Sequence, residues 1–169
     1  IDCESPRAIQ LGIGISRGDR MDWVIQKATE LGVHSITPLY TERTEVKLKG
    51  ERAEKKLRHW QQIAISACEQ CYRNTVPAIL PITPVNDWLN VEAELKFVLH
   101  HRSKNSLKNF SVPQSIALLI GPEGGLTDTE ISRATESGFQ ALTLGPRVLR
   151  TETAPLAAIS ILQSLWGDM

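Results

Sequence analysis

The sequence is poor in aromatic residues, has no long apolar run and carries no excess charge of either sign. Phe, Trp and Tyr make up 5% of the 169 residues, which disfavours a binding surface built from stacked aromatic rings. No apolar stretch approaches the roughly 18 residues of a membrane-spanning helix, and the amino end lacks the basic and then apolar pattern of a signal peptide. The formal net charge of zero does not by itself call for a nucleic acid partner. We therefore predict a cytoplasmic protein without a membrane partner.

Several common catalytic motifs are also absent. The chain has neither the glycine-rich lysine motif of a P-loop nucleotidase nor the serine elbow of an α/β hydrolase. Its four histidines lack the spacing with cysteines or carboxylates that a zinc site requires, so we predict no metal. Cys68 and Cys71 form a lone C-x-x-C pair in a predicted helix. We interpret them as apolar thiols on its inner face, with a metal or redox role as the alternative.

Short apolar strands alternate with amphipathic helices, which indicates a mostly parallel α/β sheet flanked by helices. Asp19 is a predicted N-cap, and Thr127 with Glu130 forms a predicted capping box. The predicted strands are 8–15, 35–39, 78–82, 97–100, 115–120 and 141–144. The predicted helices are 19–31, 51–73, 127–138 and a last helix that begins near residue 153.

Gly12 and Gly14 lie inside the alternation of the first predicted strand. A dinucleotide-binding fingerprint would place its glycines in the turn after the strand, so we reject that interpretation. The two glycines instead predict close approach of another backbone.

Two of the predicted strands lead directly into Gly-Pro turns. The loops that follow them comprise residues 121–125 and 145–155, and the second contains an Arg-Thr-Glu-Thr run at residues 150–153. Taken alone, either loop is only a tight turn. Loops that leave the carboxyl ends of neighbouring parallel strands line the ligand crevice, so we expect them to form two walls of one pocket.

Two helices have unusual surfaces. The helix 51–73 begins with a cluster of basic residues, which is either a solvated face or a contact for an RNA backbone. The last helix is apolar on nearly all sides, which predicts burial in the core, in a partner, or in both. The basic cluster comprises Arg52, Lys55, Lys56, Arg58 and His59.

The segments 120–126 and 144–155 resemble the two carboxyl-terminal motifs of the SPOUT methyltransferases, and within them the ribosomal RNA small subunit methyltransferase E family. Further matches lie at 27–32, 41–43, 67–70, 73–74 and 76–77. The resemblance implies that residues 1–169 form one SPOUT methyltransferase domain, an α/β fold with a carboxyl-terminal trefoil knot. It also implies a homodimer formed through the last helix, and a small upstream β-barrel that binds RNA and that we do not expect within this chain.

The same resemblance implies an activity and a cofactor. The family methylates N3 of a uridine in 16S ribosomal RNA, so the expected partner is that RNA or the small ribosomal subunit. S-adenosyl-L-methionine is expected to bind in the knot in a bent conformation, with its adenine among the loop backbones. The cofactor-binding residues that it implies are Leu99, His100, Gly121, Glu123, Gly124, Gly125, Leu144, Gly145, Leu149, Arg150 and Thr151.

The chemistry of uridine N3 suggests roles for two of these residues. The nitrogen holds its proton at neutral pH, so the enzyme must remove that proton and stabilise the charge that spreads onto O2 and O4. Arg150 is our candidate for stabilising this charge. Glu123, ahead of Glu152, is our candidate for the base, although either carboxylate also suits orienting Arg150 or bonding to loop amides.

Arg43, Arg73 and Asn74 are the predicted substrate-binding residues, because an arginine fork suits phosphates and base edges. A buried ion pair with Glu42 or Glu69 is the alternative role for these arginines. Two other functions stay open from sequence: a SPOUT methyltransferase that acts on another base or a ribose, and a non-catalytic module for RNA binding or ribosome assembly.

Overall fold

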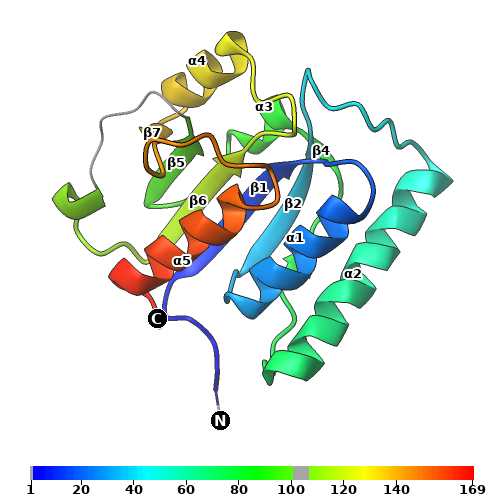
Figure 1. Ribbon diagram of the computed structural model, residues 1–169, viewed down its shortest axis with the longest axis horizontal. Helices are drawn as coiled ribbons and strands as arrows, with labels where there is room; N and C mark the ends of the chain where they lie inside the picture. The colour runs from blue at the N-terminus through cyan, green and yellow to red at the C-terminus, as the bar shows by residue number, and fades with distance from the viewer. Residues whose placement is uncertain (1, 101–106) are drawn as a thin grey trace.

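Strands and helices alternate along the chain in the computed structural model, which describes residues 2–100 and 107–169 (Figure 1). Their order is β1 (Ala8–Gly14), α1 (Asp19–Glu30), β2 (Ser35–Tyr40), α2 (Glu51–Cys71), β3 (Ala78–Ile79), β4 (Thr83–Pro84), α3 (Val85–Trp88), β5 (Leu95–Leu99), the 3-10 turn η1 (Leu107–Asn109), β6 (Ser115–Ile120), α4 (Asp128–Glu136), β7 (Gln140–Leu142) and α5 (Ala154–Trp166).

One sheet joins all the strands that the structure describes. Its order is β3-β2-β1-β6-β5-β7, β4 also pairs with β2, and every pairing is parallel. The continuous apolar run of β6 lies at the centre, where Leu118 is opposite Leu11 of β1 and Phe97 of β5. The predicted α/β sheet is therefore confirmed.

Helices cover both faces of the sheet. On one face, α1, α2 and α5 pack over the side chains of Ile9, Leu11 and Leu118, and Figure 1 shows α5 and α1 side by side in front of the strands. On the other face, α3 and α4 cover a second apolar cluster that includes Leu119 and Trp88. None of the helices in the described ranges has both the length and the apolarity needed to cross a bilayer.

The two glycines of β1 face the α3 and α4 side of the sheet at very short distances. A Cβ at Gly12 would lie 2.7 Å from the Trp88 indole, and a Cβ at Gly14 would lie 2.5 Å from the backbone nitrogen of Pro122. The predicted approach of a backbone is thus confirmed at Gly14, whereas an aromatic side chain occupies the space at Gly12. Gly14 brings β1 directly against the first Gly-Pro loop.

Local details differ from the sequence predictions, for example at the start of α1 and in the predicted strand 78–82. The capping box at Thr127 is confirmed, but Asp19 is the first residue of α1, and Gly18 with φ 60° is its N-cap. The predicted strand 78–82 is interrupted, since Pro81 has no N–H to donate to a neighbouring strand. The chain therefore pairs with β2 in two short pieces, β3 and β4.

The path from β7 to α5 brings the chain back across the sheet. β7 pairs with β5 at the end of the strand order, whereas α5 packs against α1, which covers β1. Residues 143–153 make this return, which is drawn in orange in Figure 1. They pass the carboxyl ends of β5 and β6, where the loop 121–127 also emerges.

Candidate functional site

A cavity of about 350 Å³ opens at the carboxyl ends of β5, β6 and β7. The two Gly-Pro loops form opposite parts of its wall, as expected from the sequence, and the first turn of α4 contributes a third part. Its lining residues are Arg43, Leu99, His100, Ile120, Gly121, Pro122, Glu123, Gly124, Gly125, Leu126, Asp128, Ile131, Leu142, Thr143, Leu144, Gly145, Arg147, Val148, Leu149, Thr151 and Ala154. Volume and lining are both in the usual range for a small-molecule site.

The first loop is held in a tight turn. The Gly125 N–H donates to the Pro122 carbonyl at 2.8 Å, and Gly125 has φ 76°, a conformation that favours glycine. A Cβ at Gly121 would come within 2.9 Å of the backbone nitrogen of Leu126. At its three glycines the loop therefore presents backbone directly to the cavity.

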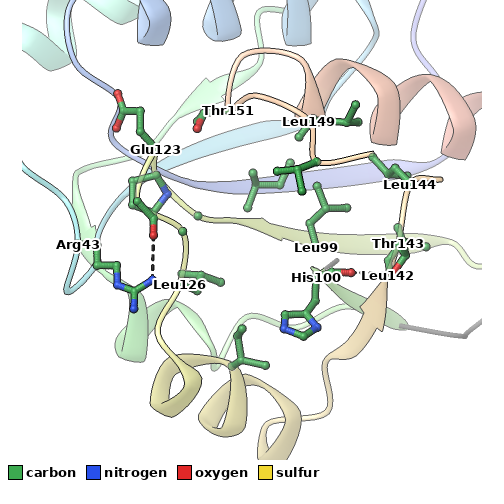
Figure 2. Close-up of a pocket in the computed structure, with 18 of the residues that line it drawn as sticks. Arg43, Leu99, His100, Glu123, Leu126, Leu142, Thr143, Leu144, Leu149 and Thr151 are labelled. Carbon is green, nitrogen blue, oxygen red and sulfur yellow. Dashed lines mark hydrogen bonds between the residues drawn. The ribbon is translucent and has the colours of Figure 1, made fainter. Parts of the chain in front are cut away.

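The ends of β5 and β7 are joined beside this loop. The His100 N–H donates to the Leu142 carbonyl at 2.9 Å, and the Thr143 hydroxyl donates to the His100 carbonyl at 2.7 Å. Leu99 and Leu144 lie near these bonds on the apolar side of the cavity (Figure 2). An apolar wall faces a backbone wall, an arrangement that suits a flat heteroaromatic ring.

The second loop closes the site and starts α5. The Arg150 carbonyl accepts hydrogen bonds from the N–H groups of Thr153 and Ala154, at 3.0 and 2.9 Å. Leu149 and Thr151 line the cavity on either side of Arg150, which is exposed and is not among the lining residues. The cofactor contact of Arg150 stays a prediction from the sequence, and its exposed position is open to a substrate.

Glu123 lies on the wall, but its carboxylate is engaged elsewhere. One oxygen accepts from the Arg17 N–H at 2.7 Å and lies 3.3 Å from Nη1 of Arg20. Figure 2 shows the carboxylate turned away from Leu99 and His100. Burial alone would raise its pKa, but these bonds, its own N–H and the Arg20 charge together lower the pKa below the ordinary value.

The lowered pKa of Glu123 makes a pH-dependent prediction. Because the ionised form is favoured in the folded state, its stabilisation is present above the ordinary carboxyl pKa and is lost as the pH falls through the folded value. Glu123→Gln is expected to lower the free energy of unfolding by about 1–2 kcal/mol near neutral pH. Urea denaturation should show this gap to wild type narrowing as the pH falls below the ordinary carboxyl pKa; an unchanged gap would contradict an ionic origin.

Arg43 joins the rim of the cavity from the segment after β2. Its Nη1 donates to the Gly124 carbonyl at 2.9 Å, the bond drawn in Figure 2. The side chain is exposed and still lines the cavity, which suits the predicted contact with substrate.

Arg73 corrects a prediction. Its guanidinium donates to both carboxylate oxygens of Glu4, at 2.6 and 3.0 Å, and to the carbonyls of Thr29 and Val33. The residue is only 8% exposed and is not among the residues that line the cavity. The alternative of a buried ion pair is therefore correct for Arg73, with Glu4 as the partner in place of Glu42 or Glu69. Asn74 also does not line the cavity.

Some lining residues were not predicted. Leu126 and Ile131 reach the cavity because the capping box turns the chain into α4 immediately after the glycine loop. The strand positions of Leu142 and Thr143 carried a local signal, since they directly precede the second Gly-Pro turn. Arg17 and Arg20 do not line the cavity, and the sequence carried no local signal for their contact with Glu123, because it joins residues 106 and 103 positions apart.

The cysteines lie away from this cavity. Cys68 is buried on the inner face of α2, Cys71 is half-buried, and both thiols are free. In the described ranges, no group of three or more His, Cys, Asp or Glu side chains could hold a metal ion.

Comparisons with known proteins agree on one family. The family model for an RNA methyltransferase domain matches residues 3–163. The ribosomal RNA small subunit methyltransferase E of Buchnera aphidicola subsp. Schizaphis graminum is 42% identical over 98% of this chain and 69% of its own length. The chain spans about two thirds of the length of the curated relatives that it matches.

Two solved structures share the fold. A protein of Legionella pneumophila, solved with its bound cofactor SAM, is 45% identical with a TM-score of 0.97 over 100% of this chain and 71% of its own. The ribosomal RNA small subunit methyltransferase E of Neisseria gonorrhoeae, bound to S-adenosyl methionine, is 48% identical with a TM-score of 0.92 over 98% of this chain and 69% of its own.

Proposed function

Because this chain belongs to the ribosomal RNA small subunit methyltransferase E family of RNA methyltransferases, we propose that it methylates N3 of a uridine in 16S ribosomal RNA with S-adenosyl-L-methionine. One observation carries the proposal: the glycine-walled cavity at the carboxyl ends of β5, β6 and β7. The site of action would be the cytoplasm, where ribosomal subunits are assembled.

The residues of the cavity fit the methyl donor. Leu99, Leu144 and Leu149 offer an apolar surface for adenine, and the backbone of residues 121–125 offers polar groups beside it. A Cβ at Gly124 would lie 3.1 Å from Cβ of Arg43, so the glycine leaves the rim open. When bound, S-adenosylmethionine supplies an electrophilic methyl group on a sulfonium.

Arg150 is the cation that we assign to the charge developing on O2 and O4 of the uridine. It is exposed between two residues of the cavity wall, so its guanidinium has access to a base entering from solvent. A planar guanidinium suits two oxygens that share one charge. Hydrogen-bond donors aimed at charge that develops in the transition state make the largest single contribution to rate acceleration in many enzymes.

Glu152 is the proton acceptor that we propose, in place of Glu123. A base should have a pKa near the working pH, whereas that of Glu123 is lowered and its carboxylate is bound by Arg17 and Arg20. Glu123 thus has the other role considered from the sequence, a bond to a loop amide. Glu152 lies two residues after Arg150 and is partly exposed.

Arg43 is the substrate contact that we retain from the sequence prediction. Its bond to the Gly124 carbonyl holds the guanidinium at the rim, beside the path by which RNA must enter. We do not retain Arg73, because its donors are used inside the protein.

We also propose the trefoil knot of the family for the carboxyl-terminal part. The return of residues 143–153 from the sheet edge to α5 supports this proposal. The returning segment passes the carboxyl ends of β5 and β6, where the loop after β6 also emerges. Knots are rare in proteins. The proposed knot would hold the two cavity loops against each other.

A homodimer through α5 is the proposed assembly. Ala158, Ile159 and Leu162 of α5 are buried against the core, whereas Ile161 and Leu165 are 38% and 45% exposed. The two exposed side chains are four residues apart and so lie on one face. They line an apolar hollow of about 420 Å³ together with Leu107, Lys108, Leu142, Thr143, Leu144 and Ser164.

Leu165→Glu is expected to shift the protein from dimer to monomer, because a carboxylate would have to be buried without a partner. Light scattering at micromolar concentration measures the mass. Trp23→Glu is the matched control, since Trp23 is a 47% exposed apolar residue on α1, and it should stay dimeric. A wild-type monomer would contradict the proposal.

The proposed reaction is tested by methyl transfer to RNA. Small subunits from cells that lack this activity are incubated with the protein and S-adenosylmethionine, and the modified nucleosides are identified by mass spectrometry. The expected product is N3-methyluridine at one position. A methylated ribose or another methylated base would instead support the broader SPOUT function, and binding of RNA without any methyl transfer would support the non-catalytic module.

A further inference from the structure

Arg17 and Arg20 do not line the cavity, but both contact Glu123 of its wall. Arg17 lies in the turn between β1 and α1, Arg20 lies in the first turn of α1, and the guanidinium of each contacts a carboxylate. Nη1 of Arg17 lies 2.9 Å from Glu45, and Nη1 of Arg20 lies 3.3 Å from Glu123. The Arg17 backbone N–H also donates to Glu123, so the turn is fixed against the first glycine loop.

These ion pairs orient the guanidinium groups without covering them. The side chains of Arg17 and Arg20 remain 62% and 42% exposed. A guanidinium carries five N–H donors, so donors remain toward solvent after each contact. With Arg43, whose Nη1 is bound to the Gly124 carbonyl, three arginines border the loop that contains Glu123.

Exposed cationic side chains continue away from the cavity along the segment between β2 and α2 and into the first turn of α2. This segment, drawn in cyan in Figure 1, runs from the rim at Arg43 to the start of α2. Lys47, Lys49 and Arg52 follow along it, and all three are exposed. The acidic residues here are Glu42, Glu45, Glu51 and Glu54, and Glu45 is paired with Arg17.

A surface of this kind fits a phosphodiester chain. The whole protein has no net charge, so its arginines and lysines attract a polyanion only where they are gathered. Arginine forks bind phosphate in two-point contacts, and lysines add charge along a flexible strand. The surface begins at the cavity rim, where a target nucleotide would enter, and extends in one direction from it.

We infer that Arg17, Arg20 and Arg43, continued by Lys47, Lys49 and Arg52, bind the phosphates of the RNA strand next to the target nucleotide. This inference rests on the proposed function for its partner. It assigns Glu123 and Glu45 to orienting the arginines. It also decides between the two interpretations of the basic cluster on α2 in favour of RNA contact at its first turn.

The test measures the affinity of the protein for a fluorescently labelled 16S ribosomal RNA fragment, without methyl donor, at several salt concentrations. Arg17→Ala/Arg20→Ala is expected to raise the dissociation constant about tenfold and to reduce the salt slope by about 0.7 for each phosphate that the variant no longer neutralises. Lys47→Gln/Lys49→Gln, which changes only exposed side chains, should act in the same direction. Arg133→Ala removes one exposed cation on α4 and serves as the control.

The inference would be overturned if both double variants kept the wild-type affinity for RNA and the wild-type salt slope. It would also be overturned if Arg133→Ala weakened RNA binding as much as the double variants do. Calorimetry with S-adenosylmethionine should give the same affinity for every variant, which separates weaker RNA binding from damage to the cavity. Wild-type protein that binds the RNA through these residues but forms no N3-methyluridine would refute the proposed function and leave this surface standing.

Discussion

Replacing Arg150 with alanine is expected to lower kcat for methyl transfer by about 10²–10³-fold, while the affinity for S-adenosylmethionine changes less than about threefold. The reason is positional: Arg150 is exposed and does not line the cavity, whereas its neighbours Leu149 and Thr151 do. Its backbone carbonyl holds the start of α5 and is unaffected by the substitution.

Single-turnover methyl transfer and calorimetry together check this expectation. Arg150→Lys should recover only part of the rate, since an ammonium keeps the charge but loses the planar fork. If the rate and the cofactor affinity fell by the same factor, Arg150 would belong to cofactor binding or to folding, and the proposed assignment of the uridine charge would be wrong.

Gly14→Ala is expected to disrupt the cavity by displacing the loop 121–125, which forms part of its wall. The added Cβ would lie 2.5 Å from the nitrogen and 2.6 Å from Cδ of Pro122, and neither atom can rotate away. The loop 121–125 must move, at a cost of about 1–3 kcal/mol for overpacking. Because this loop is the backbone wall of the site, the affinity for S-adenosylmethionine should fall at least about tenfold.

Thermal unfolding and calorimetry measure the two effects of Gly14→Ala. Ser16→Ala is the control, since Ser16 is 3% exposed and its hydroxyl has no hydrogen-bond partner in the part of the chain that the structure describes. Its removal should leave both quantities nearly unchanged. A Gly14 variant with wild-type cofactor affinity would show that the first loop does not depend on this contact.

The sequence predicted the strands best where burial was complete. β6 begins and ends at the predicted residues, because the apolar run that follows Ser115 is buried on both faces, as in a central strand. The capping box at Thr127 was equally clear, since it depends on residues three positions apart. The N-cap of α1 was misassigned because Gly18 and Asp19 both suit a helix start.

The prediction for Arg73 failed for a different reason. An arginine beside an asparagine in a family motif has the same local pattern whether its donors face RNA or the interior. Its partner Glu4 lies 69 positions away, and the two carbonyl acceptors belong to the end of α1 and the turn after it. Burial of a guanidinium requires several such partners at once, and no local pattern records them.

Sequence alone was enough for the parallel sheet, the capped helix and the two glycine loops of the cavity, because periodicity and turn chemistry act over a few residues. The roles of the charged residues depend instead on how the chain folds in space. The strand order places β6 beside β1, and this brings Arg17 and Arg20 to Glu123 over separations of 106 and 103 residues. The pKa of Glu123 depends on that contact, since the field at a carboxylate is set by distance in space.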